Sequence, residues 1–230
     1  MNELTKKNNF ISKIKKLITE NIKFLFISIF IIISVIAFTQ YFIYYNEKKI
    51  LKTSLDFSKA KSNSDNSDFR MIMIELSKKK NFYGILATLE KINLIINDDI
   101  YLANDEYMKL LNDKKITNIY KSAIAIHGSY SFLNKIEFID SKISTNNEKK
   151  IYIIEKVNNL LFYVDSNLIS YEALKLEILF MISILEKDSS VNNNNNDDIV
   201  SQYNFIMNNE NISSSIKERV NKINEFQKYK

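Results

Sequence analysis

The near absence of glycine and proline constrains the fold of this chain more than any other feature. Its 230 residues include two glycines and no proline. β-Hairpins and other tight turns depend on glycine for positive φ angles and on proline for a fixed φ angle, so this composition argues against them. Helices joined by turns of Asn, Asp and Ser need neither residue. We therefore expect an all-α protein.

The apolar residues after residue 46 support this expectation, because they recur at steps of three and four, the spacing of one helix face. Polar breaks separate the apolar series at residues 97–99, 112–115, 144–147, 165–167 and 189–198. Short connections between consecutive helices produce antiparallel hairpins. Three of the series are Ile85, Leu89, Ile92, Ile96; Ile116, Ile119, Ala123, His127, Tyr130; and Tyr171, Leu174, Ile178, Met181, Leu185.

A membrane-spanning helix is predicted from Phe24 to Tyr45, where the 22 residues include no charge. A helix of this length rises about 33 Å, and a hydrocarbon core is about 30 Å thick. The hydroxyls of Ser28, Ser34 and Thr39 are expected to bond back to the helix backbone. The apolar run is too long for a cleaved signal peptide, and no small-x-small cleavage site follows it. We therefore expect the anchor to stay attached.

The net charge of +5 is concentrated at the N-terminus. Residues 1–45 contain six lysines and two glutamates, which leaves the remaining 185 residues nearly neutral. A nearly neutral domain offers little for the dense phosphate contacts of nucleic-acid binding, so no nucleic acid is expected as a partner. Lysines flank the apolar run on both sides, and Lys6 and Lys7 give the N-terminal side the excess. The positive-inside rule then places the N-terminus in the cytoplasm.

Catalytic and cofactor motifs are missing from the sequence. The chain has no cysteine, and two glycines cannot supply a P-loop or a Rossmann motif. His127, the only histidine, has two interpretations: a partly buried residue bonded to a neighbouring carbonyl, or a general base acting with Ser129 or Ser131. We favour the first, and expect no enzyme activity, no cofactor and no metal.

Two helical hairpins share an internal pattern. In the first, small Ala103 precedes aromatic Tyr107 by four residues, and in the second Ser201 precedes Phe205 by the same interval. A small residue lets two helices approach closely, and an aromatic one turn later fills the groove between neighbouring hairpins. These four residues are therefore predicted to be helix-packing positions of a repeat.

The order of parts, a basic lead-in, a membrane helix, a linker helix and degenerate hairpins, resembles tetratricopeptide-like single-pass membrane proteins related to the ancillary subunit of the bacterial Sec translocon. The resemblance runs from about Lys13 to Phe226 and is clearest in FRMIMIELSKKKNFYGILATLEKI, where Tyr83 and Ala87 fall at positions that favour an aromatic and a small residue. It implies a cytoplasmic segment (1–23), a transmembrane helix (24–45), linker helices (46–80) and a tetratricopeptide-like domain (81–230).

The resemblance also implies a function and a location. We expect a protein-interaction scaffold at the bacterial inner membrane, with its C-terminal domain in the periplasm and with the translocon or periplasmic chaperones as partners. An envelope-assembly or stress-signalling scaffold is the alternative. A hydrolase centred on His127 is the least favoured function, because no sequence motif indicates an orienting acid or an oxyanion donor.

Overall fold

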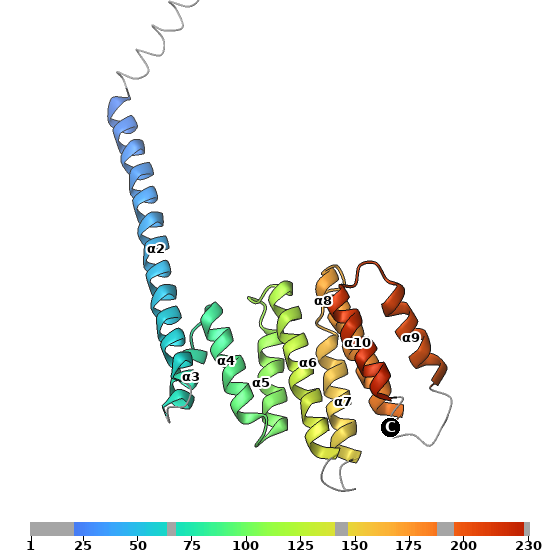
Figure 1. Cartoon of the computed structure of the whole chain (residues 1–230). Helices are drawn as coiled ribbons and strands as arrows, with labels where there is room; N and C mark the ends of the chain where they lie inside the picture. Colours follow the sequence, from blue (N-terminus) through green and yellow to red (C-terminus); the bar gives the residue numbers. More distant parts are fainter. Residues whose placement is uncertain (1–20, 64–67, 141–146, 188–195, 228–230) are drawn as a thin grey trace, which may run out of the picture. The chain divides into compact units, whose positions relative to one another are not determined.

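The structure, a computed structural model, describes residues 21–63, 68–140, 147–187 and 196–227, and every regular element in them is an α-helix (Figure 1). The chain divides into two units, Met1–Asn63 and Ser64–Lys230. The described helices are α2 (Ile22–Ser62), α3 (Phe69–Ser77), α4 (Phe82–Ile95), α5 (Ile100–Asn112), α6 (Asn118–Asp140), α7 (Asn147–Leu161), α8 (Ile169–Lys187), α9 (Asn196–Asn208) and α10 (Ser214–Gln227).

The first unit contains α2, which is long and apolar enough to cross a membrane. Its large apolar side chains, from Ile22 to Tyr45, are exposed on all sides of the helix. The Ser28 hydroxyl donates to the Phe24 carbonyl at 2.8 Å, and the Thr39 hydroxyl donates to the Ile36 carbonyl at 2.8 Å, as predicted. The helix does not end with the apolar run. It continues without a break to Ser62 and so includes the first part of the predicted linker.

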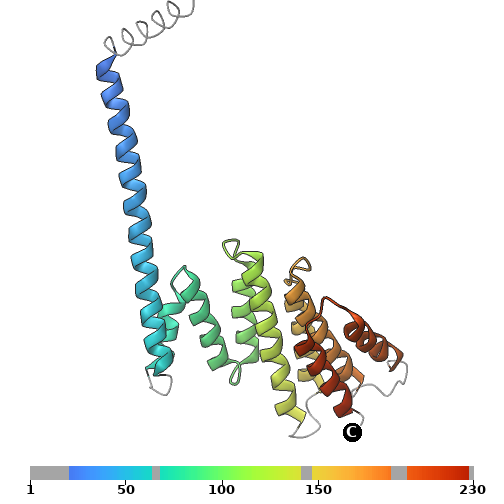
Figure 2. The same ribbon diagram turned by 45° about the horizontal axis from the view of Figure 1, so that its top comes forward.

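In the second unit, consecutive helices run in alternating directions (Figures 1 and 2). The α3–α4, α5–α6 and α7–α8 turns consequently lie at one end of the unit, and the α4–α5 turn lies at the other. The predicted breaks at 97–99, 112–115 and 165–167 are confirmed as connections between helices. Most of the breaks at 144–147 and 189–198 lies outside the described residues, although α9 already begins at Asn196, inside the second of them.

The second unit has two apolar cores, and α8 belongs to both. Ile178 and Ile182 face the core formed with α4 to α7, whereas Phe180 and Ile184 face the core formed with α9 and α10. A helix buried on two sides has no single apolar stripe. The predicted α8 series therefore contains only one of these four residues, Ile178.

The predicted stripe before and along α6 is only partly confirmed, for the same reason: Ile116 is buried and Tyr130 packs against the core, but the stripe omits most of the buried residues of α6. Ile119 is 49% exposed, and Tyr130 is only partly buried. The residues that face the core are instead Ile124, Ala125, Ile126, Phe132, Leu133 and Ile136, which surround more than half of the helix. This helix packs against α5, α7 and α8, so apolar residues are needed on several of its faces.

An ion pair between a buried glutamate and a half-exposed arginine connects α8 to α10. Arg219 donates from Nε to Oε1 of Glu177 at 2.7 Å and from Nη2 to Oε2 at 2.6 Å. The Glu177 side chain is 2% exposed, so its charge requires a partner with several donors. Arginine has this fork geometry and lysine does not, and Arg219 is one of only two arginines in a chain whose other basic residues are lysines.

The predicted helix-packing positions are buried in the first hairpin and exposed in the second. Ala87, Ala103 and Tyr107 are completely buried. Ser201 is exposed and Phe205 is 57% exposed, because α9 turns a different face, with Ile199 and Ile206, toward its core. The packing role predicted for Ser201 and Phe205 therefore does not fit their positions in α9.

Leucine substitutions at two of these positions should have opposite outcomes. We expect Ala103→Leu to lower the free energy of unfolding by about 1–3 kcal/mol, because its extra methylenes have no space between α5 and the rest of the core. Ser201→Leu, on the exposed face of α9, should change it by less than about 0.5 kcal/mol. Circular dichroism melts of the full chain in detergent micelles provide the measurement. Equal losses of stability in both variants would contradict the burial of Ala103 and the exposure of Ser201.

Candidate functional site

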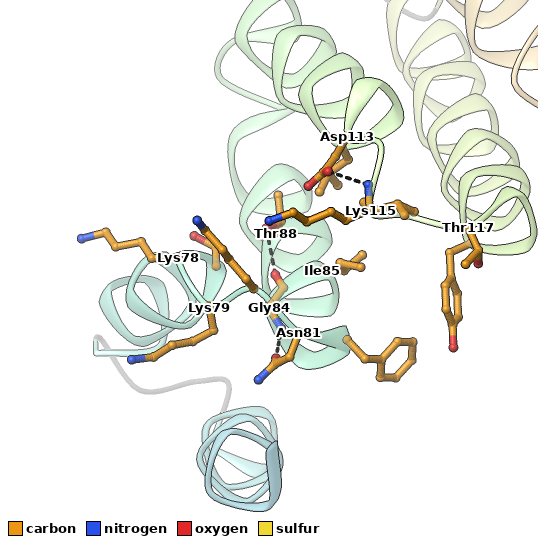
Figure 3. Close-up of a pocket in the computed structure, with 15 residues that line it drawn as sticks. Lys78, Lys79, Asn81, Gly84, Ile85, Thr88, Asp113, Lys115 and Thr117 are labelled. Carbon is orange, nitrogen blue, oxygen red and sulfur yellow. Dashed lines mark hydrogen bonds between the residues drawn. The ribbon is translucent and has the colours of Figure 1, made fainter. Parts of the chain in front are cut away.

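An open groove of about 530 Å³ lies at the end of the second unit that carries the α3–α4 and α5–α6 turns (Figure 3). The two turns, the start of α4, the end of α5 and the start of α6 surround it. Its apolar floor includes Ile85, Leu110 and Ile116, and four lysines line its rim. The groove therefore combines an apolar interior with a positively charged edge.

The α3–α4 turn is shaped by residues near the start of α4. The Asn81 side chain caps α4 by accepting a hydrogen bond from the Gly84 backbone N–H at 3.0 Å. The Lys79 carbonyl oxygen lies only 1.9 Å from the position that a Cβ atom on Gly84 would occupy. Glycine at residue 84 thus lets the end of α3 approach α4 closely, and this approach leaves Lys78, Lys79 and Lys80 exposed in the turn.

The α5–α6 turn supplies the opposite side of the groove. The Asp113 carboxylate accepts a hydrogen bond from the Lys115 backbone N–H at 2.9 Å, and buried Ile116 fixes the turn to the core. Lys115 extends from this turn across the groove toward Thr88, whereas Lys78 and Lys79 extend outward from the α3–α4 turn (Figure 3). Lysines from both turns therefore contribute positive charge to the groove and its margin.

Phe82 and Tyr120 form an aromatic wall between α4 and α6. Their ring centroids are 5.5 Å apart, and each side chain remains 43% exposed. Rings at this separation attract each other in a tilted arrangement, which holds the wall in place. The exposed ring surface is available to an apolar group that enters the groove.

The charges of the groove are largely uncompensated. Among the described residues, four lysines, Lys78, Lys79, Lys80 and Lys115, and one carboxylate, Asp113, line the groove. Within the described part of the chain, none of these lysines forms an ion pair, whereas lysines elsewhere pair with Glu106, Glu155, Glu172 and Glu218. The N-termini of α4 and α6 lie in the same region as the C-termini of α3 and α5, so the partial charges of the helix ends offset each other and the net positive charge comes from the lysines. This arrangement favours an anionic group.

His127 is part of a polar contact inside the helical core. Its Nδ1 atom lies 2.9 Å from the Tyr107 hydroxyl, so its partner is a side chain and not the predicted carbonyl. Burial lowers the pKa of His127, and the nearby charge of Glu90 opposes this shift. Burial also raises the pKa of Tyr107 to about 12, and a hydrogen bond with Ser131 opposes that shift. Both groups are therefore held neutral.

The proposed serine partners of His127 are also engaged elsewhere. Ser129 is buried, and its hydroxyl donates to the Ala125 carbonyl at 2.8 Å, on its own helix. Ser131 lies close enough to the Tyr107 hydroxyl to affect its pKa. The described residues thus contain a Tyr107–His127 pair with the features of a buried structural contact.

The acidic residues around α5 have structural partners. Asp99 caps α5 by accepting hydrogen bonds from the backbone N–H groups of Tyr101 and Leu102. Glu106 accepts from Lys91 at 2.7 Å and from Lys109 at 2.9 Å. Among the residues that the structure describes, no group of three or more His, Cys, Asp and Glu side chains could hold a metal ion.

Local sequence patterns do not identify the groove. The run Lys78–Lys79–Lys80 belongs to the segment that carries the family resemblance, and residues 112–115 have the composition of a turn. The available signal was a lysine run followed directly by an asparagine cap and, three residues later, by one of the two glycines. The helix directions were also needed, because they bring two turns more than 30 residues apart in the sequence to the same end.

Comparisons with known proteins provide no evidence about function, so the groove is the main evidence. No family model matches the chain, and no curated protein and no solved structure matches it. The tetratricopeptide resemblance therefore stays a prediction.

The close approach at Gly84 leads to a stability test. Alanine normally stabilises a helix by about 1 kcal/mol relative to glycine. We expect Gly84→Ala to destabilise the protein by about 1–3 kcal/mol instead, because the added Cβ would overlap a backbone carbonyl that has to move. Asn93→Ala, at an exposed position of the same helix, is the control and should be neutral or slightly stabilising. Stabilisation by Gly84→Ala in chemical denaturation would contradict the contact with Lys79.

Proposed function

We propose that this chain is a membrane-anchored protein-interaction scaffold without enzyme activity, at the outer face of a bacterial inner membrane. In this proposal α2 is the anchor, the helical hairpins form a tetratricopeptide-like domain, and the basic groove binds the partner protein. The observation that carries it is the groove itself, where unpaired lysines surround an exposed aromatic wall and an apolar floor.

The exposed apolar surface of α2 supports the anchor. Its phenylalanine, isoleucine and valine side chains surround the whole helix, so packing one face against a protein would leave the others in water. Exposing so large an apolar surface to water is unfavourable, and a lipid environment covers every face at once. The lysine excess at Lys6 and Lys7 supports an N-terminus in the cytoplasm.

The composition of the groove supports a protein partner. Ligand sites usually have volumes of about 300–1,000 Å³ and combine apolar walls with a few polar groups, and the groove fits this description. Four ammonium groups at its rim can pair with carboxylates of a partner without first losing an internal partner. The membrane anchor would raise the local concentration of the groove near proteins at the same membrane.

The identity of the partner class rests on the family resemblance. That resemblance suggests the Sec translocon or periplasmic chaperones, which operate where the proposed orientation would place the domain. An envelope-assembly scaffold would use the same groove, but no observation in the structure favours it.

Site-specific photocrosslinking in intact cells tests the proposal. We expect benzoylphenylalanine at Tyr120, in the groove wall, to form protein adducts that disappear when Lys78, Lys79 and Lys80 are all changed to Gln. The same probe at Ile151, which is 65% exposed on α7 and outside the groove, is the matched control and should not form these adducts. Identical adducts from both positions, or none from Tyr120, would contradict a protein-binding groove.

A further inference from the structure

The chemistry of the groove suggests which part of a partner it binds. We propose that it recognises an acidic linear segment, in which carboxylates flank a central aromatic or large aliphatic side chain. This inference rests on the proposed function and names the ligand class of the same site.

The lysines are placed to contact carboxylates on two sides. Lys78, Lys79 and Lys80 belong to the α3–α4 turn, and Lys115 comes from the α5–α6 turn on the opposite side of the groove. Figure 3 shows Lys115 reaching across the opening. An extended segment with separated carboxylates can engage Lys115 and the lysines of the α3–α4 turn together.

The centre of the groove requires an apolar group. Phe82 and Tyr120 expose ring surface, and Ile85, Leu110 and Ile116 form the floor. Burying an aromatic or aliphatic side chain here would remove apolar surface of both partners from water. The preferred segment therefore has acidic residues on both sides of a large apolar residue and is not uniformly acidic.

The size of the groove and the charge of the domain distinguish this ligand from other anions. Its volume of about 530 Å³ greatly exceeds that of a free phosphate or carboxylate ion. A bilayer offers a flat array of headgroups that would contact the rim and leave the recessed floor unfilled. Nucleic acid needs a longer basic track, and residues 46–230 are nearly neutral overall. A peptide segment uses both the rim and the floor.

A substitution at Asp113 should change the affinity for an acidic ligand in the opposite direction from the lysine substitutions. Among the described residues it is the one carboxylate that lines the groove, and it should repel an acidic ligand. Asp113→Asn removes the charge but keeps a side-chain oxygen that can accept the hydrogen bond from the Lys115 backbone N–H. The turn should therefore keep its conformation while the groove becomes more positive.

The experiment uses the full chain in nanodiscs of phosphatidylcholine, a lipid without net charge. The probe is a fluorescein-labelled peptide, Gly-Asp-Glu-Leu-Phe-Glu-Asp-Gly, and its matched control replaces each acid by its amide. Fluorescence anisotropy gives the dissociation constants. The protein variants are Lys78→Gln/Lys79→Gln/Lys80→Gln, Lys115→Gln and Asp113→Asn. Lys187→Gln, an exposed lysine on α8 outside the groove, is the control, and circular dichroism checks that each variant is folded.

We expect the triple variant to weaken acidic-peptide binding about tenfold or more and Lys115→Gln to weaken it about threefold to tenfold, with Lys187→Gln within about twofold. Asp113→Asn should strengthen binding about twofold to threefold, and the amide peptide should bind at least about tenfold more weakly. Rising salt should reduce binding, since the groove charges are exposed.

Equal binding of the acidic and amide peptides, or folded lysine variants that bind like the unmodified chain, would overturn the inference. Binding of phosphatidylglycerol vesicles or of a twelve-nucleotide oligothymidine in place of the peptide would overturn it as well. If the peptide fails while the lysine-dependent crosslinks at Tyr120 persist, the ligand class is wrong and the scaffold function stands. If those crosslinks are also missing, the proposed function fails too.

Discussion

Helix α8 is buried on two sides and so joins the two apolar cores of the helical domain. Ile178 and Ile182 belong to the core shared with the preceding helices, and Phe180 and Ile184 belong to the core shared with α9 and α10. Glu177 of α8 forms a bidentate ion pair with Arg219, which attaches α10 to α8. A helix that packs in this way cannot rotate without exposing apolar groups or an unpaired charge, so it fixes the register of both cores.

The alternating helix directions that these cores stabilise also create the groove. They bring the α3–α4 and α5–α6 turns to one end, where residues distant in sequence line the same depression. Lysines in a helix turn are usually solvated and have little effect. Here they surround exposed rings and an apolar floor, so charge and apolar surface are presented together. The groove thus offers two kinds of contact within the reach of one short segment.

The sequence was sufficient to predict the helices but not to predict which face of each helix is buried. Low glycine and proline content, apolar periodicity and polar breaks predicted the helices, and the uncharged run predicted the long apolar helix with its hydroxyls bonded back to the backbone. The core face of α6 and the packing of Ser201 and Phe205 could not be obtained in this way, because a helix with several neighbours has no single stripe and a repeat-like pattern does not determine which face turns inward. The close approach at Gly84 and the groove depend on contacts between turns, which local patterns do not contain.

The proposed function requires that the chain crosses a membrane once and presents the groove on the outer side. Because the protein has no cysteine, a single introduced cysteine gives an unambiguous signal. The most direct measurement is labelling of Thr117→Cys, at the groove, and of Asn8→Cys, in the lysine-rich lead-in, with a membrane-impermeant maleimide. We expect Thr117→Cys to react in intact cells and Asn8→Cys to react only after permeabilisation. The reverse pattern, or equal labelling of both positions in intact cells, would contradict it.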